Sequence, residues 1–258
     1  MTPRFPTSLH QDAAECVRDY FSVLSNVDTV LVVNSCARGQ AVPESDLDFA
    51  ILVKPETSLG EKTTIESDWQ TYAETQPALL KYKQSNPFAK LHLDIVDGNY
   101  VPNTIEEGAA PDSFELEVGN QIRYSAPMGE PGSYFLKLEN KWLPYYEEGL
   151  RLQRLRTAHE ACEYDLEHVP FYVRRGLYFQ AFDTLYRAFQ IYLQTLFIAN
   201  RTYPIAYNKW IKEQVVKWLG KPELYPPLAP ILSVSDLESE QVNDKASMLR
   251  ELLGEIGD

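Results

Sequence analysis

The pattern of hydrophobic residues changes near residue 130, and this change constrains the fold more than any other feature of the sequence. Before it, short β-branched or apolar runs alternate with turn residues, which is typical of strands in one sheet. These runs are "TVLVVNS" at 29–35, "LDFAILV" at 47–53, "LHLDIV" at 91–96 and "FELEVGNQIRYS" at 114–125. After the stretch "SAPMGEPGS" at 125–133, the spacing becomes helical. The sequence therefore predicts an α+β protein in which a mixed β-sheet domain with flanking helices, residues 1–128, precedes an all-α helical-bundle domain, residues 129–258.

Helical spacing also appears in residues 12–26 and 63–84 of the first half, and a proline interrupts the second of these regions. In the second half, residues 134–168 predict one or two helices broken near Pro144. A long, buried helix is expected to end near Asn200, because apolar residues recur on one face at steps of three and four. Its expected buried residues are Leu177, Ala181, Leu185, Ala188, Tyr192 and Leu196. Shorter helices are expected within 206–220, 225–233 and 245–256.

Composition excludes several classes of protein. The longest apolar runs fall far short of the roughly 20 residues that span a bilayer, and the N-terminus lacks the basic-then-apolar plan of a signal peptide. We therefore expect a cytoplasmic protein without a membrane partner. The three cysteines show no CxxC spacing and are expected to be free thiols. A net charge of -13, with 9 basic against 19 acidic residues in the first 128, argues against general nucleic-acid binding.

Two aspartates flank the start of the predicted strand "LDFAILV". Side chains two residues apart project from the same face of a strand, so Asp46 and Asp48 are expected to point together. Neighbouring carboxylates repel each other unless a cation lies between them, and their oxygen atoms suit Mg²⁺, which keeps water and substrate phosphates as further ligands. A solvated strand edge is the alternative. Upstream, the turn "NSCARG" at 34–39 offers backbone N–H groups and the Ser35 hydroxyl to a phosphate.

The combined stretch "NSCARGQAVPESDLD" resembles the nucleotidyltransferase superfamily that includes the antibiotic nucleotidyltransferases and DNA polymerase beta. The matching positions are Ser35, Ala37, Arg38, Gly39, Asp46 and Asp48. The family's third carboxylate lies on a later strand, and Asp94 in "LHLDIV" has this setting, with Asp97 as the alternative. The resemblance implies a polymerase beta-like fold for residues 1–128. It also implies two Mg²⁺ ions held by the acids at 46, 48 and 94, with ATP or another nucleoside triphosphate as co-substrate.

The turn departs from the family pattern at one residue, because Asn34 stands where the family has glycine. Glycine allows unusual backbone angles and a close approach of phosphate, and asparagine tolerates the left-handed conformation better than most other residues. The resemblance makes Asn34, Ser35 and Arg38 nucleotide-binding residues. For Arg38, two readings stay open, a clamp on the triphosphate or an ion pair with local acids.

A second, weaker resemblance lies in the other half. "FIANRTYPIAYNKWIKE" at 197–213 is similar to the C-terminal segment of aminoglycoside nucleotidyltransferase-like proteins, in which a helical domain follows the catalytic one. This resemblance implies that Lys209 binds the nucleotide phosphates, with Arg187 and Arg175 behind it. An ordinary helix-surface lysine is the alternative.

The expected activity is transfer of a nucleoside monophosphate, AMP from ATP, to a hydroxyl of a small molecule such as an aminoglycoside-like compound, with release of pyrophosphate. Asp94 or Glu163 is the candidate general base. One alternative is an RNA- or protein-modifying nucleotidyltransferase of the toxin–antitoxin type, and another is a non-catalytic nucleotide-binding module. The RNA alternative relies on a local basic patch formed by Arg151, Arg154, Arg156, Arg174 and Arg175. Acceptor, nucleotide preference and oligomeric state stay open.

Overall fold

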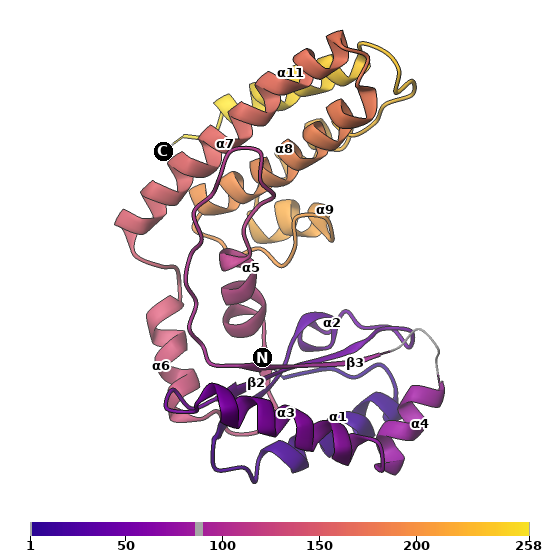
Figure 1. The fold of residues 1–258 in the computed structure, drawn as a ribbon, viewed down its shortest axis with the longest axis vertical. Coiled ribbons are helices and arrows are strands. Elements are labelled where there is room, and N and C mark those ends of the chain that lie inside the picture. The colour runs from indigo at the N-terminus through magenta and orange to yellow at the C-terminus, as the bar shows by residue number, and fades with distance from the viewer. Residues whose placement is uncertain (1, 86–89, 258) are drawn as a thin grey trace. The chain divides into compact units, whose positions relative to one another are not determined.

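The chain forms two compact units in a computed structural model that describes residues 2–85 and 90–257 (Figure 1). The first unit contains Met1–Tyr100 and Glu117–Leu143, and the second contains Val101–Leu116 and Pro144–Asp258. The first unit carries the sheet and the second is helical, so the predicted α+β class is confirmed. The units do not follow a single cut after residue 128, and the division into a catalytic domain 1–128 and a helical domain 129–258 stays a prediction.

The first unit is built on a mixed four-stranded sheet with the order β3-β2-β1-β4. Its strands are β1 (Val27–Val32), β2 (Leu47–Val53), β3 (Leu91–Val96) and β4 (Ala126–Pro127). Strand β1 pairs antiparallel with β2 and β4, and β2 pairs parallel with β3. The first three strands agree with the sequence prediction, and the parallel pair places β3 at one edge of the sheet.

Helices cover one face of this sheet, and the apolar side of the strands packs against them. The α-helices of the first unit are α1 (Ser8–Phe21), α2 (Asn34–Arg38), α3 (Leu59–Ala73), α4 (Pro77–Ser85) and α6 (Ser133–Trp142). The helices that pack on the apolar face of the sheet are α1, α3 and α4. Val32, Phe49 and Ile51 point into a core that also contains Phe21 of α1 and Trp69 of α3. The predicted break between α3 and α4 falls just before the proline that begins α4.

Helix α6 is held to β1 by a carboxylate cap. Asp28 of β1 accepts hydrogen bonds from the backbone N–H groups of Tyr134 and Phe135, both at 3.0 Å. A carboxylate at a helix N-terminus satisfies N–H groups that have no partner within the helix. Gly132 permits this approach, because a Cβ atom there would overlap the Asp28 carboxylate.

The predicted strand at 114–125 is wrong, because this segment is helical. It forms α5 (Phe114–Val118) and a π-helical turn, η1 (Gly119–Arg123). The alternation of apolar and polar residues in "FELEV" suggested a strand, but the buried residues Phe114, Val118 and Ile122 recur every four positions. That spacing is a helical stripe. A buried glutamate in the segment, Glu115, supplied the apparent polar position.

The second unit is a helical bundle organised around two long helices and the C-terminal one. Its elements are α7 (Glu148–Arg174), α8 (Tyr178–Ala199), α9 (Ile211–Glu213), the π-helix η2 (Gln214–Trp218), the 3₁₀-helix η3 (Pro222–Leu224), α10 (Tyr225–Leu228) and α11 (Gln241–Gly254). The break near Pro144 and the helix end next to Asn200 are confirmed. All the expected face residues of α8 are buried, whereas Leu177 precedes the helix and is 37% exposed. No helix within the described ranges is long and apolar enough to cross a membrane.

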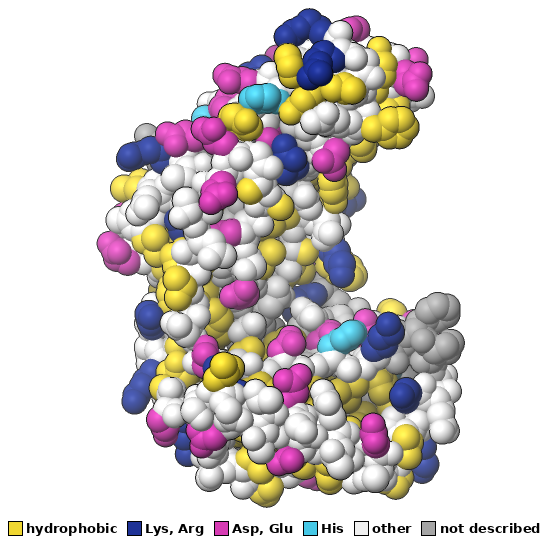
Figure 2. Space-filling model, in the orientation of Figure 1, with side chains coloured by type: hydrophobic (Ala, Val, Ile, Leu, Met, Phe, Trp, Pro, Cys, Tyr) yellow, Lys and Arg dark blue, Asp and Glu magenta, His cyan; other side chains and the backbone are white. Residues whose placement is uncertain are grey.

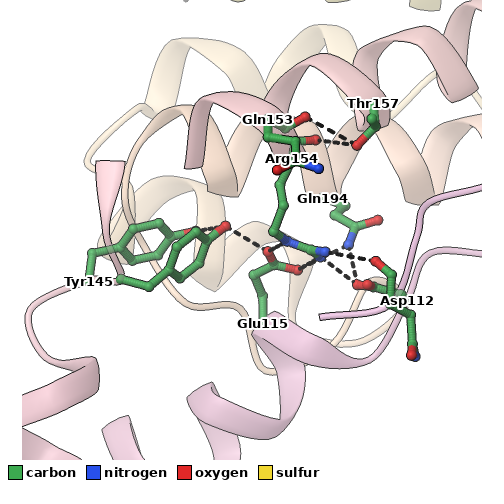
Figure 3. A network of polar contacts seen from close by, with 9 residues as sticks. Asp112, Glu115, Tyr145, Gln153, Arg154, Thr157 and Gln194 are labelled. Carbon is green, nitrogen blue, oxygen red and sulfur yellow. Dashed lines mark hydrogen bonds and ion pairs between the residues drawn. The ribbon is translucent and has the colours of Figure 1, made fainter. Parts of the chain in front are cut away.

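A buried ion pair ties the segment Val101–Leu116 to the long helices (Figure 3). Glu115 is fully buried, and Arg154 of α7 donates to its two oxygens at 2.6 and 2.7 Å. The same guanidinium donates to Asp112 at 2.7 Å. Gln194 of α8 donates to both carboxylates, at 2.8 Å to Asp112 and 3.0 Å to Glu115. Removing one partner of such a pair leaves a buried charge without compensation, which costs about 3–5 kcal/mol.

Two buried tyrosines beside this network allow a stability prediction in which one substitution is the control for the other. The Tyr146 hydroxyl donates to Glu115 at 2.8 Å, whereas the Tyr207 hydroxyl has no hydrogen-bond partner among the described residues. Tyr146→Phe is expected to lower the free energy of unfolding by about 1.5–3 kcal/mol, because it removes a bond to a charged acceptor. Tyr207→Phe is expected to leave it unchanged or raise it by ~1 kcal/mol, because it removes an unsatisfied buried group.

Urea denaturation followed by circular dichroism measures both values. Equal losses in the two variants would contradict the assigned hydrogen bonding.

Candidate functional site

The turn after β1 is built around a left-handed residue. Asn34 has φ 57°, which turns the chain from β1 into α2, and Gly39 with φ 69° ends that short helix. The Val33 N–H donates to the carbonyl of Asp48 at 3.0 Å, which fixes the turn beside β2. The left-handed geometry that asparagine was expected to tolerate is thus the geometry Asn34 adopts. Asparagine at position 34 therefore supports the left-handed backbone of this turn.

The backbone of Asn34 leads to a stability prediction. Asn34→Ala is expected to lower the free energy of unfolding by ~1 kcal/mol, because an alanine Cβ crowds the following carbonyl in the left-handed region. Asn34→Gly removes the Cβ and is expected to be at least as stable as the wild type. Thermal and urea denaturation of the two variants test this difference. If alanine were tolerated as well as glycine, the left-handed conformation would not be required.

The predicted acids lie on the sheet face opposite the apolar core. In the parallel register, Asp48 pairs with His92 and Ala50 pairs with Asp94. Partners in a parallel pair project from the same side, and so do residues two apart, so Asp48 and Asp94 share a face. Asp48 is half-buried and Asp94 is exposed. Asp46 lies immediately before β2 and is half-buried.

Asp46 is engaged by the neighbouring strand. Its Oδ1 accepts the Lys90 N–H at 2.7 Å, and its Oδ2 lies 3.8 Å from Nε2 of His92. Within residues 2–85 and 90–257, no three His, Cys, Asp or Glu side chains form a group that could hold a metal ion. The donor type nevertheless fits Mg²⁺, because the acids offer hard oxygen atoms on one face of adjacent strands.

The alternative third acid, Asp97, has a different environment. It follows β3 and accepts a hydrogen bond from Nζ of Lys62 at 2.7 Å. This bond lowers the pKa of the Asp97 carboxyl. Its cationic partner comes from α3, on the helical side of the sheet, so Asp94 is the better placed of the two to join Asp48.

Two buried side chains that the sequence interpretation missed support the loop before β2. The Tyr82 hydroxyl lies 3.3 Å from the carbonyls of both Ser45 and Lys90, and thus links the residues that precede β2 and β3. Nε2 of His10 lies 3.1 Å from the same Ser45 carbonyl, and its Nδ1 lies 2.8 Å from the Thr7 hydroxyl. A neutral imidazole with its proton on Nε2 satisfies both contacts. No sequence motif marks either residue, since both contacts are long-range.

Cys36 is a packing residue rather than a nucleophile. It is fully buried in the core, and its Sγ lies 3.9 Å from the carbonyl of Asp46. Burial, together with the nearby charge of Asp48, raises the pKa of the thiol to about 11. Since the thiolate is the reactive form, the protonated Cys36 is inert near neutral pH. Burial also raises the pKa of Cys162.

Thiol labelling tests these environments. In the native protein at about pH 8, only the partly exposed Cys16 is expected to react with a disulfide reagent, because Cys36 and Cys162 are buried and protonated. Denaturation should expose all three. The Cys16→Ser variant should therefore show almost no native labelling, and rapid labelling of this variant would show that a buried thiol is reactive.

The remaining nucleotide-binding candidates of the turn have local partners. Ser35 lies in the first turn of α2 and is half-buried. Arg38 at the end of α2 donates through Nε to the Gln40 side chain at 3.1 Å. The contacts of both residues to a phosphate stay predictions.

The other predicted site residues, Arg187, Glu163 and Lys209, belong to the second unit. Arg187 donates two hydrogen bonds of 2.7 Å to the fully buried Asp165, which gives it a structural role. Glu163 accepts from Arg250 at 3.1 Å. Lys209 is exposed, directly before the residue that caps α9. Nucleotide binding by Arg187 and Lys209, and proton transfer by Glu163, stay predictions.

The basic patch proposed for RNA binding loses two of its five arginines to the interior, whereas Arg156, Arg174 and Arg175 are exposed. Arg151 and Arg154 are 2% and 3% exposed, and both are paired with glutamates. On the face shown in Figure 2, lysine and arginine side chains are interspersed with acidic ones rather than joined in a continuous basic surface. This distribution weakens the RNA-modifying alternative.

Comparison with protein families connects this site to a known domain. Residues 13–115 match the family model described as the nucleotidyltransferase domain. No curated protein matches the sequence. The matched part includes the turn at Asn34 and the acids Asp46, Asp48 and Asp94. The match supports the nucleotidyltransferase superfamily and a general nucleotidyl transfer activity, and domains of this family generally use a nucleoside triphosphate and a divalent metal ion. The segment at 197–213 lies outside it.

Proposed function

We propose that the protein is a Mg²⁺-dependent nucleotidyltransferase that transfers AMP from ATP to a hydroxyl group of a small molecule. The observation that carries this proposal is that the turn and the acids lie together within the matched region. The nucleotidyltransferase match at 13–115 contains a left-handed turn at Asn34 directly beside β2, together with Asp48 and Asp94 on one face of the parallel pair β2–β3.

The acids and the turn have complementary roles in this proposal. Asp46, Asp48 and Asp94 would hold two Mg²⁺ ions, which would supply positive charge for the triphosphate and for the oxygens that enter and leave the α-phosphorus. The backbone N–H groups of the turn and the Ser35 hydroxyl bind the phosphates, and Arg38 adds a charge-assisted contact.

The reaction itself is an in-line displacement. The acceptor oxygen forms a bond to the α-phosphorus, the bond between the α-phosphorus and the bridging oxygen of the β-phosphate breaks, and pyrophosphate leaves with the electron pair. The proton of the acceptor hydroxyl passes to a carboxylate. Asp94 is the first candidate because it is exposed on the edge strand, and Glu163 is the second.

The charge of the first half favours a cationic acceptor. Nineteen acidic residues against nine basic ones in residues 1–128 create a negative field that attracts amines. An aminoglycoside-like compound combines several amines with hydroxyl groups and fits this field. It is therefore the acceptor class we propose to test first.

Carboxamide variants test the assignment of the acids. In the presence of Mg²⁺, Asp48→Asn and Asp94→Asn are each expected to reduce pyrophosphate release from ATP at least about 100-fold, because each removes an anionic oxygen ligand. Asp97→Asn is the matched control on the same strand end, where the carboxylate pairs with Lys62, and it should retain activity. The measurement is transfer of labelled α-phosphate to a panel of hydroxyl compounds.

Calorimetry with ATP separates the remaining alternatives. Binding that requires Mg²⁺ and is lost in Asp48→Asn supports the metal-dependent enzyme. Binding without Mg²⁺, combined with no pyrophosphate release from any nucleoside triphosphate, would indicate a non-catalytic nucleotide-binding module. Loss of activity in Asp97→Asn but not in Asp94→Asn would move the third ligand to Asp97.

A further inference from the structure

Strand β3 forms an edge of the sheet in the first unit, because the strand order places it beside β2 alone. The N–H of Leu47 in β2 donates to the carbonyl of Lys90 at 2.8 Å, and the backbone groups of successive residues alternate in direction along a strand. The N–H and carbonyl groups of Leu91, Leu93 and Ile95 therefore point away from β2. Among the described residues, no hydrogen bond reaches these outward groups.

This edge lacks the features that usually prevent an edge strand from pairing with another chain. Natural edge strands are very short, are interrupted by a bulge or a proline, or carry lysine side chains. Strand β3 pairs with β2 over six consecutive residues without a bulge, and it contains neither proline nor lysine. Its outer edge is therefore suited to the addition of another strand.

The apolar side chains of β3 are only partly covered by the helices. Leu91, Leu93 and Ile95 are half-buried, whereas the residues of β2 that face the same core are all buried. A mainly apolar groove of about 830 Å³ adjoins the start of β3, where Trp69 of α3 and Leu79 of α4 lie beside Leu91. A strand added next to β3 would extend the core and remove more of this apolar surface from water.

The sequence of β3 is complementary to itself in the antiparallel direction. When two copies pair about a two-fold axis at Leu93, this residue lies opposite its own copy, and Leu91 lies opposite Ile95 of the partner subunit. All the outward backbone groups are then paired, with about six hydrogen bonds in total. On the other face, the exposed His92 lies opposite the partner subunit's Asp94. An imidazole beside a carboxylate is a favourable cross-strand pair.

We propose that two copies of this protein associate through β3, so that their sheets form one continuous sheet across a two-fold axis. A second copy is the favoured occupant because both faces of the strand match, with apolar against apolar on the core face and imidazole against carboxylate on the other. A shift of one residue would set Leu93 against the partner's Asp94, so the same pattern specifies the register. This inference goes beyond the proposed function and does not depend on it.

Sedimentation equilibrium of the full-length chain measures this association. The wild type is expected to form a dimer whose fraction rises with concentration. His92→Asp is expected to raise the dimer dissociation constant about tenfold or more, because like charges replace complementary groups at two symmetric positions. His92→Lys is the matched control and should retain the dimer, because it keeps a positive charge opposite Asp94. The double variant His92→Asp with Asp94→Lys exchanges the charges and should restore association.

Two further measurements locate the interface on β3. Amide hydrogen exchange followed by NMR should show protection of the Leu91, Leu93 and Ile95 N–H groups at high protein concentration and loss of this protection on dilution. Leu93→Pro removes an outward N–H group at an edge position where proline is tolerated, so it should abolish the dimer and preserve the near-UV circular dichroism. If this variant does not fold, the charge variants at His92 and the exchange data decide the question.

Several outcomes would overturn the proposal. One is a wild type that sediments as a monomer at every concentration up to about 100 µM. Another is a dimer that neither His92→Asp nor Leu93→Pro weakens, or one that leaves the three amides unprotected. Pairing of an unrelated peptide strand with a monomeric wild type would assign the edge to a different occupant. Pyrophosphate release plays no part in these measurements, so an inactive dimer retains the interface and an active monomer rejects it.

Discussion

The buried pair of Arg154 and Glu115 is the interaction on which the arrangement of the chain depends. The chain leaves the sheet unit after Tyr100, returns at Glu117 and leaves again after Leu143. Glu115 is fully buried, and this is possible because Arg154 and two uncharged donors, Tyr146 and Gln194, donate hydrogen bonds to its carboxylate. The pair therefore holds the segment Val101–Leu116 in the helical unit. Most of this segment nevertheless lies inside the matched nucleotidyltransferase region, which ends at residue 115.

Within the sheet unit, the register of two strands connects packing to chemistry. Phe49 and Ile51 must face the core, which forces Asp48 to the other side of β2. The parallel pairing then brings Asp94 to that same side. A slip of one residue in β3 would turn Asp94 toward the apolar core, so the burial of hydrophobic residues protects the geometry of the candidate site.

Local patterns were sufficient to predict the first three strands and the long helices, because periodicity records which face is buried. They did not predict that Asp94 shares a face with Asp48, which follows from the parallel register of β2 and β3. They failed at 114–125, where a glutamate looked solvent-exposed and is instead buried by an arginine 39 residues away. They also missed Tyr82 and His10, whose contacts to the Ser45 carbonyl span 37 and 35 residues. Such contacts depend on the tertiary structure, and no local spacing encodes them.

Two left-handed residues, Asn34 and Trp210, differ in how their conformation is maintained. Asn34 is a residue type that tolerates positive φ, so the turn before α2 is encoded locally and needs little support. Trp210 is not, and its conformation depends on the side chain of Gln214 four residues later. An ordinary surface loop would place a small residue there at lower cost, since glycine meets no steric barrier. The left-handed conformation of Trp210 is therefore imposed by the contacts of a fully buried glutamine and not by the preference of the residue itself.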